Sequence, residues 1–278
     1  MDDFNEATAT DLVLARLEGC DDPRLKEIMS SVIRHLHAVV RETEPSEAEW
    51  LAAIEFLTAT GQICDDKRQE YIMLSDTLGV SMLLDAINNR RPAAATPSTV
   101  LGPFHVDGAE AMANGANISK GDAAGAPLLV SGRVLDLDGA PIAGALLDVW
   151  QASGEGVYDV QDPDRDDLDL RGKFRTDDDG RFHFNTVTPS SYPLPTDGPV
   201  GQLLARLGRH PYRPAHIHFI VSAAGYAPVT THLFAAGDGY LESDVVFGVK
   251  DSLIVDFAPR QDGPGRTVDY DFVLSPVG

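Results

Sequence analysis

Short apolar runs separated by turn signals fill the chain from about residue 127 to its end. Asp-Gly pairs at 138–139 and 179–180 mark tight turns between such runs. Many short strands at close spacing, with few helical patterns between them, are typical of an antiparallel β-sandwich. The runs that follow this pattern occupy residues 128–135, 145–152, 181–187, 215–223, 229–236, 252–259 and 268–274.

The first 90 residues carry a different pattern, in which apolar side chains recur at the 3.6-residue spacing of helices. Ile28, Val32 and Leu36 lie in one such stripe, and two further stripes follow within residues 50–57 and 71–84. These stripes are compatible with ordinary core packing and with a dimer interface. The sequence leaves both interpretations open.

A Pro/Ala-rich junction at residues 90–99 separates the two regions. The fold expected is therefore mainly β with α. A helical N-terminal domain over residues 1–98 precedes a β-sandwich domain over residues 99–278.

Charge and cysteine content narrow the class of protein. The chain has 43 acidic and 22 basic residues and a net charge of -21, which argues against nucleic-acid binding and against attraction to anionic membranes. Its two cysteines, Cys20 and Cys64, are too few for a disulfide framework. The acidic start lacks the features of a signal peptide, and no apolar run approaches the roughly 20 residues of a membrane span. These features predict a cytoplasmic protein.

The apolar run at residues 213–221 contains two histidines, His216 and His218. Side chains two apart in a strand point to the same face, so both imidazoles can reach one metal ion. An isolated His-X-His pattern is common, however, and often represents rings paired with backbone or solvent. A cupin normally has a glutamate a few residues after the second histidine, and none is present here. A zinc hydrolase needs a third ligand, and no spacing singles one out.

Two tyrosines suggest a different metal. Tyr158 follows two glycines, and Tyr192 lies among prolines in a stretch that favours a rigid, non-helical loop. A tyrosine hydroxyl has an ordinary pKa of about 10, so only a strongly Lewis-acidic ion such as ferric iron holds it deprotonated at neutral pH. Taken alone, each tyrosine is better explained as a packed aromatic with a hydrogen-bonded hydroxyl.

Six segments together make the chain similar to the intradiol ring-cleaving dioxygenases, in particular to their hydroxyquinol-cleaving branch. The resemblance covers nearly the whole chain, including the helical part. The segments that carry it are TVLGPFHV (99–106), DVWQASGEGVYDVQDPD (148–164), LRGKFRTDDDGRFHF (170–184), SYPLPTDGPVG (191–201), RPAHIHFIVSAAGY (213–226) and THLFAAGDGYLESDVVFGVK (231–250).

The resemblance implies one ferric, non-haem iron per subunit, held by Tyr158, Tyr192, His216 and His218. It also implies that Tyr192 acts as a catalytic base and that Arg213 stabilises negative charge on the substrate. A further catalytic contribution is expected from His232, which stands where catechol-cleaving members usually have glutamine. Substrate-binding residues implied by the same resemblance, besides Arg213, are Asp76, Val100, Leu101, Gly102, Pro103, Phe104, Leu194, Pro195 and Val246.

The activity implied is insertion of both atoms of O2 into hydroxyquinol, with cleavage between the 1- and 2-hydroxyl carbons. Asp76 is a candidate for binding the third hydroxyl, and a surface or helix-capping aspartate is the equal alternative. Catechol or chlorocatechol is the alternative substrate, and a non-catalytic β-sandwich binding module is the alternative of another class. The family also implies a homodimer formed through the helical part, with a bound phospholipid at the dimer interface.

Overall fold

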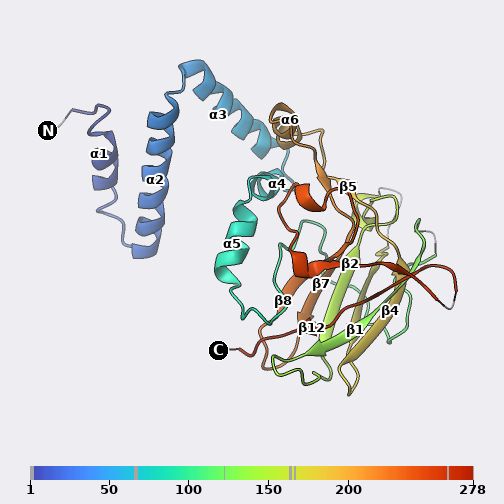
Figure 1. The fold of residues 1–278 in the computed structure, drawn as a ribbon. Helices are drawn as coiled ribbons and strands as arrows, with labels where there is room; N and C mark the ends of the chain where they lie inside the picture. The colour runs from blue at the N-terminus through green and yellow to red at the C-terminus, as the bar shows by residue number, and fades with distance from the viewer. Residues whose placement is uncertain are drawn as a thin grey trace. The chain divides into compact units, whose positions relative to one another are not determined.

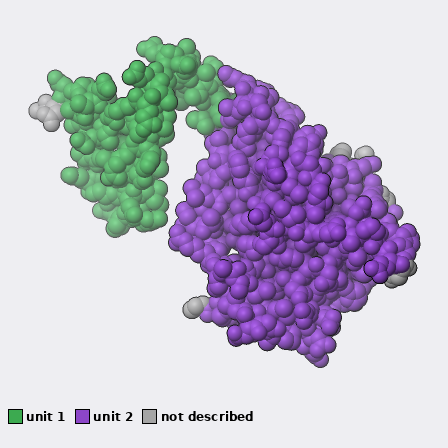
Figure 2. Space-filling view, in the orientation of Figure 1, with its two compact units in different colours: residues 1–59 green, residues 60–278 purple. Residues whose placement is uncertain are grey.

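The computed structural model describes residues 3–65, 68–121, 123–162, 165, 167–261 and 263–277. Two compact units are present, residues 1–59 and residues 60–278 (Figure 2). The boundary between them falls inside a helix, whereas the predicted boundary at residues 98 and 99 separates the helical segments from the β-rich segments.

The helical region expected before residue 99 is present. Among the described residues, no helix is both long and apolar enough to cross a membrane. Asp22 begins the longest helix, because its side chain accepts hydrogen bonds from the backbone N–H groups of Arg24 and Leu25. The helices are α1 (Ala9–Ala15), α2 (Pro23–Thr43), α3 (Glu47–Gln62), α4 (Glu70–Thr77), α5 (Val80–Asn88) and α6 (Pro199–Arg206).

The strands from residue 127 onward form the predicted β-sandwich (Figure 1). One five-stranded sheet contains β1, β4, β10, β11 and β12, and the other has the order β3-β2-β7-β8-β9. The strands are β1 (Pro127–Leu135), β2 (Leu146–Gln151), β3 (Arg171–Arg175), β4 (Arg181–Val187), β5 (Tyr192–Pro193), β6 (Tyr212–Arg213), β7 (His216–Ser222), β8 (Val229–Ala235), β9 (Ile254–Val255), β10 (Ala258–Pro259), β11 (Arg266–Asp269) and β12 (Phe272–Val273).

The sheets are mostly antiparallel, as expected, but three strand pairs are parallel. The strand β1 pairs in parallel with β11 and β12, and β8 pairs in parallel with β9. Long stretches of chain separate the two members of each pair. No hairpin therefore fixes their relative direction.

One hydrophobic core fills the space between the two sheets. Phe182 and Phe184 from β4 and Phe219 from β7 lie in this core, and each is at most 2% exposed. The alternating pattern of these strands thus buries one face of each sheet, as the period of two requires. The opposite face of the β7 sheet is left available for polar side chains.

Two elements lie in a stretch expected to be a rigid, non-helical loop. Tyr192 begins the short strand β5, which pairs with β6 so that Tyr192 lies opposite Arg213. The helix α6 then begins at Pro199, a residue suited to the first helical position because its missing N–H has no helical partner there. The prolines of this stretch therefore do not exclude regular structure.

Candidate active site

The two histidines of the His-X-His pattern lie in β7, the central strand of its sheet. Ile217 faces the sandwich core, so His216 and His218 project together from the opposite face. Both rings are buried, with exposed fractions of 2% and 1%. Trp150 on β2 is paired with His218, and its indole stacks on the imidazole at a centroid distance of 4.5 Å.

The first tyrosine, Tyr158, follows β2 and immediately precedes a short 3₁₀ turn at Asp159–Gln161. Its ring stacks on Phe104 at a centroid distance of 4.4 Å. Arg171 ties these two segments together, because it forms a buried ion pair with Asp159 and donates a hydrogen bond to the carbonyl of Phe104 at 2.6 Å. This arrangement fixes the loop that carries Tyr158.

The second tyrosine, Tyr192, is positioned by its pairing with β6 and by a close approach of the backbone at Gly156. A Cβ atom at Gly156 would lie only 2.8 Å from the Cβ of Tyr192, and the φ of 79° at this residue favours glycine. The two tyrosines therefore meet because a glycine lets their loops pack closely.

Four side-chain atoms from these residues converge on one point. The Nε2 atoms of His216 and His218 are 3.0 Å apart, and the hydroxyl oxygen of Tyr158 lies 3.0 Å from Nε2 of His218. The hydroxyl oxygens of Tyr158 and Tyr192 are 3.4 Å apart. Two atoms that each bind one metal ion at about 2.0–2.1 Å, at angles between about 90° and 109°, lie about 2.9–3.4 Å from each other. These distances are therefore compatible with four ligands of one metal ion.

The protonation states also fit a cation. Burial, followed by the charge of Arg213, lowers the pKa of His216 to about 3, and burial lowers the pKa of His218 well below its usual value. Both imidazoles are therefore neutral near pH 7, the form that binds metals. Burial raises the pKa of the Tyr158 hydroxyl well above its ordinary value and also raises that of Tyr192. The phenols consequently need a strong positive charge beside them to ionise.

Arg213 lies directly beside this set of atoms, with one Nη1–H facing Nε2 of His216 at 3.2 Å. Its guanidinium is held by Asp244, which accepts from Nε at 3.1 Å and from Nη2 at 3.3 Å. Although burial opposes it, the charge of Asp244 keeps the pKa of Arg213 above its usual value. A permanent positive charge is thus present at the site.

His232 lies on β8 directly opposite His218 and is fully buried. Its Nε2 atom is 2.7 Å from Nδ1 of His218, and its Nδ1 atom is 2.7 Å from the hydroxyl of Thr99. The three histidines form a potential metal-binding group. The contacts of His232, however, are to the back of the His218 ring and not to the four converging atoms.

A cavity of about 790 Å³ opens in front of Tyr192 and Arg213. Leu101 differs from the other predicted wall residues, because it is 43% exposed and is not among the described residues that line the cavity. His232 does not line it either. The predicted residues that do line it are Asp76, Val100, Gly102, Pro103, Phe104, Tyr192, Leu194, Pro195, Arg213 and Val246.

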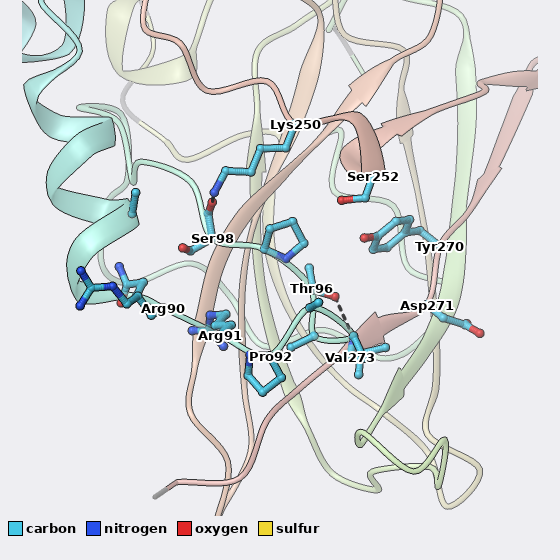
Figure 3. Close-up of a pocket in the computed structure, with 16 residues that line it drawn as sticks. Arg90, Arg91, Pro92, Thr96, Ser98, Lys250, Ser252, Tyr270, Asp271 and Val273 are labelled. Atoms are coloured by element: carbon cyan, nitrogen blue, oxygen red, sulfur yellow. Dashed lines mark hydrogen bonds between the residues drawn. The ribbon is translucent and has the colours of Figure 1, made fainter.

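A second hollow, of about 430 Å³, lies beside the segment that leads into the cavity wall (Figure 3). Thr96, Ser98, Lys250 and Val273 are among its lining residues, and none of the predicted site residues is. The Nζ of Lys250 donates to the backbone carbonyl of Ser98. This hollow is therefore separate from the candidate active site.

Comparison with known proteins assigns the family. Residues 100–276 match the dioxygenase family model, and residues 22–96 match the model of the catechol dioxygenase N terminus. The chain belongs to the intradiol ring-cleavage dioxygenase family. This dioxygenase is 54% identical to hydroxyquinol 1,2-dioxygenase of Rhizobium sp. (strain MTP-10005), over 98% of this chain and 96% of the relative.

Two further relatives cover almost the full length of the dioxygenase. The 6-chlorohydroxyquinol 1,2-dioxygenase of Cupriavidus pinatubonensis is 51% identical over 100% of both chains. The crystal structure of hydroxyquinol 1,2-dioxygenase from Pseudomonas putida DLL-E4 superposes with a TM-score of 0.93 at 48% identity, over 98% of this chain and 99% of that one.

Several residues of the dioxygenase site were not anticipated from the sequence. Trp150 stacks on His218, Asp244 binds Arg213 and Thr99 faces His232, but no spacing in the sequence singles these three residues out. The pairing of Asp159 with Arg171 was also missed. A buried aspartate facing a buried arginine is a recognisable signal only once the fold brings the two together.

Proposed function

We propose that the protein is a ferric hydroxyquinol 1,2-dioxygenase with one iron ion per subunit, held by Tyr158, Tyr192, His216 and His218. The observation that carries this proposal is the convergence of two neutral imidazole nitrogens and two phenol oxygens at spacings of 3.0–3.4 Å. The names of the full-length relatives support hydroxyquinol as the substrate.

The choice of iron follows from the donor set. Phenolate is a hard anionic ligand, and burial makes these phenols difficult to ionise unless a highly charged cation lies beside them. Calcium, magnesium and zinc sites are usually built from other ligand sets. Ferric iron held by these four residues would make the substrate ring reactive toward direct attack by O2. Both oxygen atoms enter the product, 3-hydroxy-cis,cis-muconate or its tautomer maleylacetate, and no external reductant is needed.

The protein's own residues supply proton transfer and charge stabilisation. The Tyr192 side chain lines the cavity and is placed to accept a proton from a substrate hydroxyl. Arg213 lines the same cavity and stabilises negative charge that develops on the substrate. Because Asp244 holds two of its nitrogens, the guanidinium keeps a fixed direction during the reaction. We propose that His232 supports His218 and does not contact the substrate.

We propose that Asp76 selects the third hydroxyl of hydroxyquinol. The side chain is buried at the end of α4 and lines the cavity, where a surface aspartate would not lie. Burial raises the pKa of this carboxyl group, which indicates a poorly solvated position that gains from a hydrogen-bond partner. Catechol and chlorocatechol lack the third hydroxyl and cannot make this bond.

We further propose that a second copy of the chain covers the apolar face of α2. None of the 21 residues of this helix is buried, and even its apolar side chains are exposed. Val32, Leu36 and Val39 are 41%, 59% and 54% exposed. An amphipathic helix of this kind needs an apolar partner to be stable. A homodimer with a phospholipid at its interface provides one. Light scattering tests the proposed dimer, and lipid extraction followed by mass spectrometry tests the proposed phospholipid.

Because Cys20 and Cys64 are both free, we also propose a reducing, cytoplasmic location.

Oxygen uptake with hydroxyquinol and with catechol, run beside an iron assay, tests the proposed activity. We expect a protein with one iron per chain that consumes one O2 per ring and prefers hydroxyquinol. A preference for catechol would shift the substrate and leave the reaction class in place. A colourless protein that cannot be loaded with ferric iron would instead indicate a binding module without catalysis.

A further inference from the structure

A buried line of three side chains extends from the ligand set away from the cavity. The hydroxyl of Thr99 lies 2.7 Å from Nδ1 of His232, and Nε2 of His232 lies 2.7 Å from Nδ1 of His218. All three residues are at most 2% exposed, so water does not replace any of these contacts. Each group must therefore find its donor or acceptor within this line.

The tautomer of His216 is set by partners that have only one role. Its Nδ1 faces the carbonyl oxygen of Pro214 at 2.7 Å, and a carbonyl only accepts, so Nδ1 carries the proton. Its Nε2 faces an N–H of Arg213, which only donates. The Nε2 atom of His216 is therefore free of a proton, as a metal ligand must be.

The tautomer of His218 depends on the rest of the line. A proton on Nδ1 of His218 is donated to Nε2 of His232, which then carries its own proton on Nδ1 and donates it to Thr99. In the opposite arrangement Thr99 donates to His232, His232 donates to His218, and the proton of His218 occupies the metal-binding Nε2. The direction of the bond at Thr99 thus decides whether His218 can bind a metal.

We propose that Thr99 is a positioning residue whose hydroxyl accepts the proton of His232 Nδ1 and so keeps Nε2 of His218 free for the metal. In the first arrangement the Nε2 atoms of His216 and His218 each have a hydrogen-bond donor. Arg213 donates to His216, and the hydroxyl of Tyr158 lies 3.0 Å from His218. The proposal rests on the iron site proposed above.

The backbone before Thr99 is anchored in a way that supports this role. Thr96 exchanges two hydrogen bonds with Val273, of 2.9 and 2.8 Å, and Lys250 donates to the carbonyl of Ser98 (Figure 3). The N–H of Thr99 itself donates to Thr230 on β8 at 2.8 Å. The hydroxyl is therefore held beside His232 by a segment whose backbone is bonded to β12 of one sheet and to β8 of the other.

The test compares Thr99→Val with Thr99→Ser in the full-length protein. Valine keeps the shape but can neither accept nor donate, whereas serine keeps the hydroxyl. A suitable control is Thr231→Val, because Thr231 is also buried on β8 and its hydroxyl donates to the carbonyl of Pro97 at 2.8 Å. Two quantities are measured: retention of ferric iron against a chelator, and the ¹⁵N spectrum of the imidazoles after the iron is removed.

We expect Thr99→Val to lose iron about 10–100-fold more readily, as is usual when a partner of a metal ligand is removed. Its imidazole spectrum should show the proton of His218 moved from Nδ1 to Nε2. Thr99→Ser and Thr231→Val should keep both the iron and the wild-type tautomers. Unchanged tautomers in Thr99→Val would overturn the inference even if iron were lost.

The wild-type spectrum is a test that needs no variant. Protons on Nδ1 of both His218 and His232 are required, and a proton on Nε2 of either ring would overturn the inference even if Thr99→Val did not fold. Failure of the iron site itself is recognised separately, because the wild-type protein would then bind no ferric iron.

Discussion

Arg213 and Asp244 form a two-point ion pair whose side chains are only 3% and 2% exposed. The carboxylate also accepts the backbone N–H of Gly248 at 2.9 Å, so it holds both the guanidinium and the loop that carries the cavity residue Val246. The pair joins β6 to a loop 31 residues further along the chain. The position of the charge beside the substrate thus depends on a residue that does not line the cavity.

Replacing Asp244 by asparagine leaves the charge of Arg213 buried without a counterion. We expect the free energy of unfolding to fall by about 3–5 kcal/mol, because breaking a buried pair costs more than the pair contributes. Turnover should fall as well, since the guanidinium loses its fixed direction. Urea unfolding and steady-state kinetics measure both effects. The exposed Glu242 on the same loop provides the control Glu242→Gln, and equal stability of the two variants would contradict the expectation.

Gly248 leaves room for the same ion pair. A Cβ atom at this position would lie 2.9 Å from Nη2 of Arg213 and 3.1 Å from Oδ2 of Asp244. We therefore expect Gly248→Ala to lower kcat by displacing the guanidinium while the protein retains its iron. Gly239→Ala is the matched control, because no heavy atom lies within 4 Å of its added methyl group. Loss of iron in Gly248→Ala would assign this glycine to the metal site instead.

The two tyrosines should give the loaded protein a red-brown colour through phenolate-to-iron charge transfer. We expect Tyr158→Phe and Tyr192→Phe each to weaken the visible band, because each removes one phenolate. The half-buried Tyr212 lies next to Arg213 and stacks on Tyr240, so Tyr212→Phe tests for a general effect of removing a hydroxyl. Absorbance spectra with matched iron assays provide the measurement. Unchanged spectra in both ligand variants would contradict the assignment.

Asp76 should discriminate between two substrates that differ by one hydroxyl group. Loss of a hydrogen bond to a charged group costs about 1.5–3 kcal/mol, which corresponds to roughly 10–100-fold in kcat/KM. We expect Asp76→Leu to lose that factor with hydroxyquinol and much less with catechol, which serves as the internal control. An equal loss with both substrates would show that Asp76 supports the cavity and does not read the third hydroxyl.

The iron-free protein should lose stability on acidification. Burial lowers the pKa of His216 from 6.5 to about 3, so below pH 6.5 the unfolded chain binds a proton that the folded chain does not. The free energy of unfolding should therefore be fully maintained above pH 6.5 and fall by about 1.4 kcal/mol per pH unit from this residue as the pH drops toward 3. Urea unfolding across this range measures the slope. His216→Gln should reduce this slope by the contribution of one proton. An unchanged slope would contradict the lowered pKa of His216.

The fold class followed from local patterns, because strand alternation and helical periodicity are both encoded in short windows. His216 and His218 could be placed on one face of a strand for the same reason. Their partners could not be identified in this way. The hydroxyl of Tyr158 meets His218 across 60 residues of sequence, and only the resemblance to the family linked the two beforehand.

The function of the apolar stripes could not be read from the sequence either. The periodicity of Val32 and Leu36 was correct, but a helical stripe has the same appearance whether it faces a core or a partner. Asp76 presented the same difficulty, since the sequence left a surface and a cavity position equally open. Its position became clear only when α4 and the loop after β5 were seen to line one cavity.

The four residues of the ligand set belong to segments that differ in how firmly their backbone is held. His216 and His218 belong to a strand with neighbours on both sides, so their amide hydrogens should exchange only in rare, large-scale openings. Tyr192 comes instead from a two-residue strand, whose few backbone hydrogen bonds can open at lower free energy. A metal bound by these four residues would therefore be released and reloaded from the Tyr192 side while the central strand stays folded.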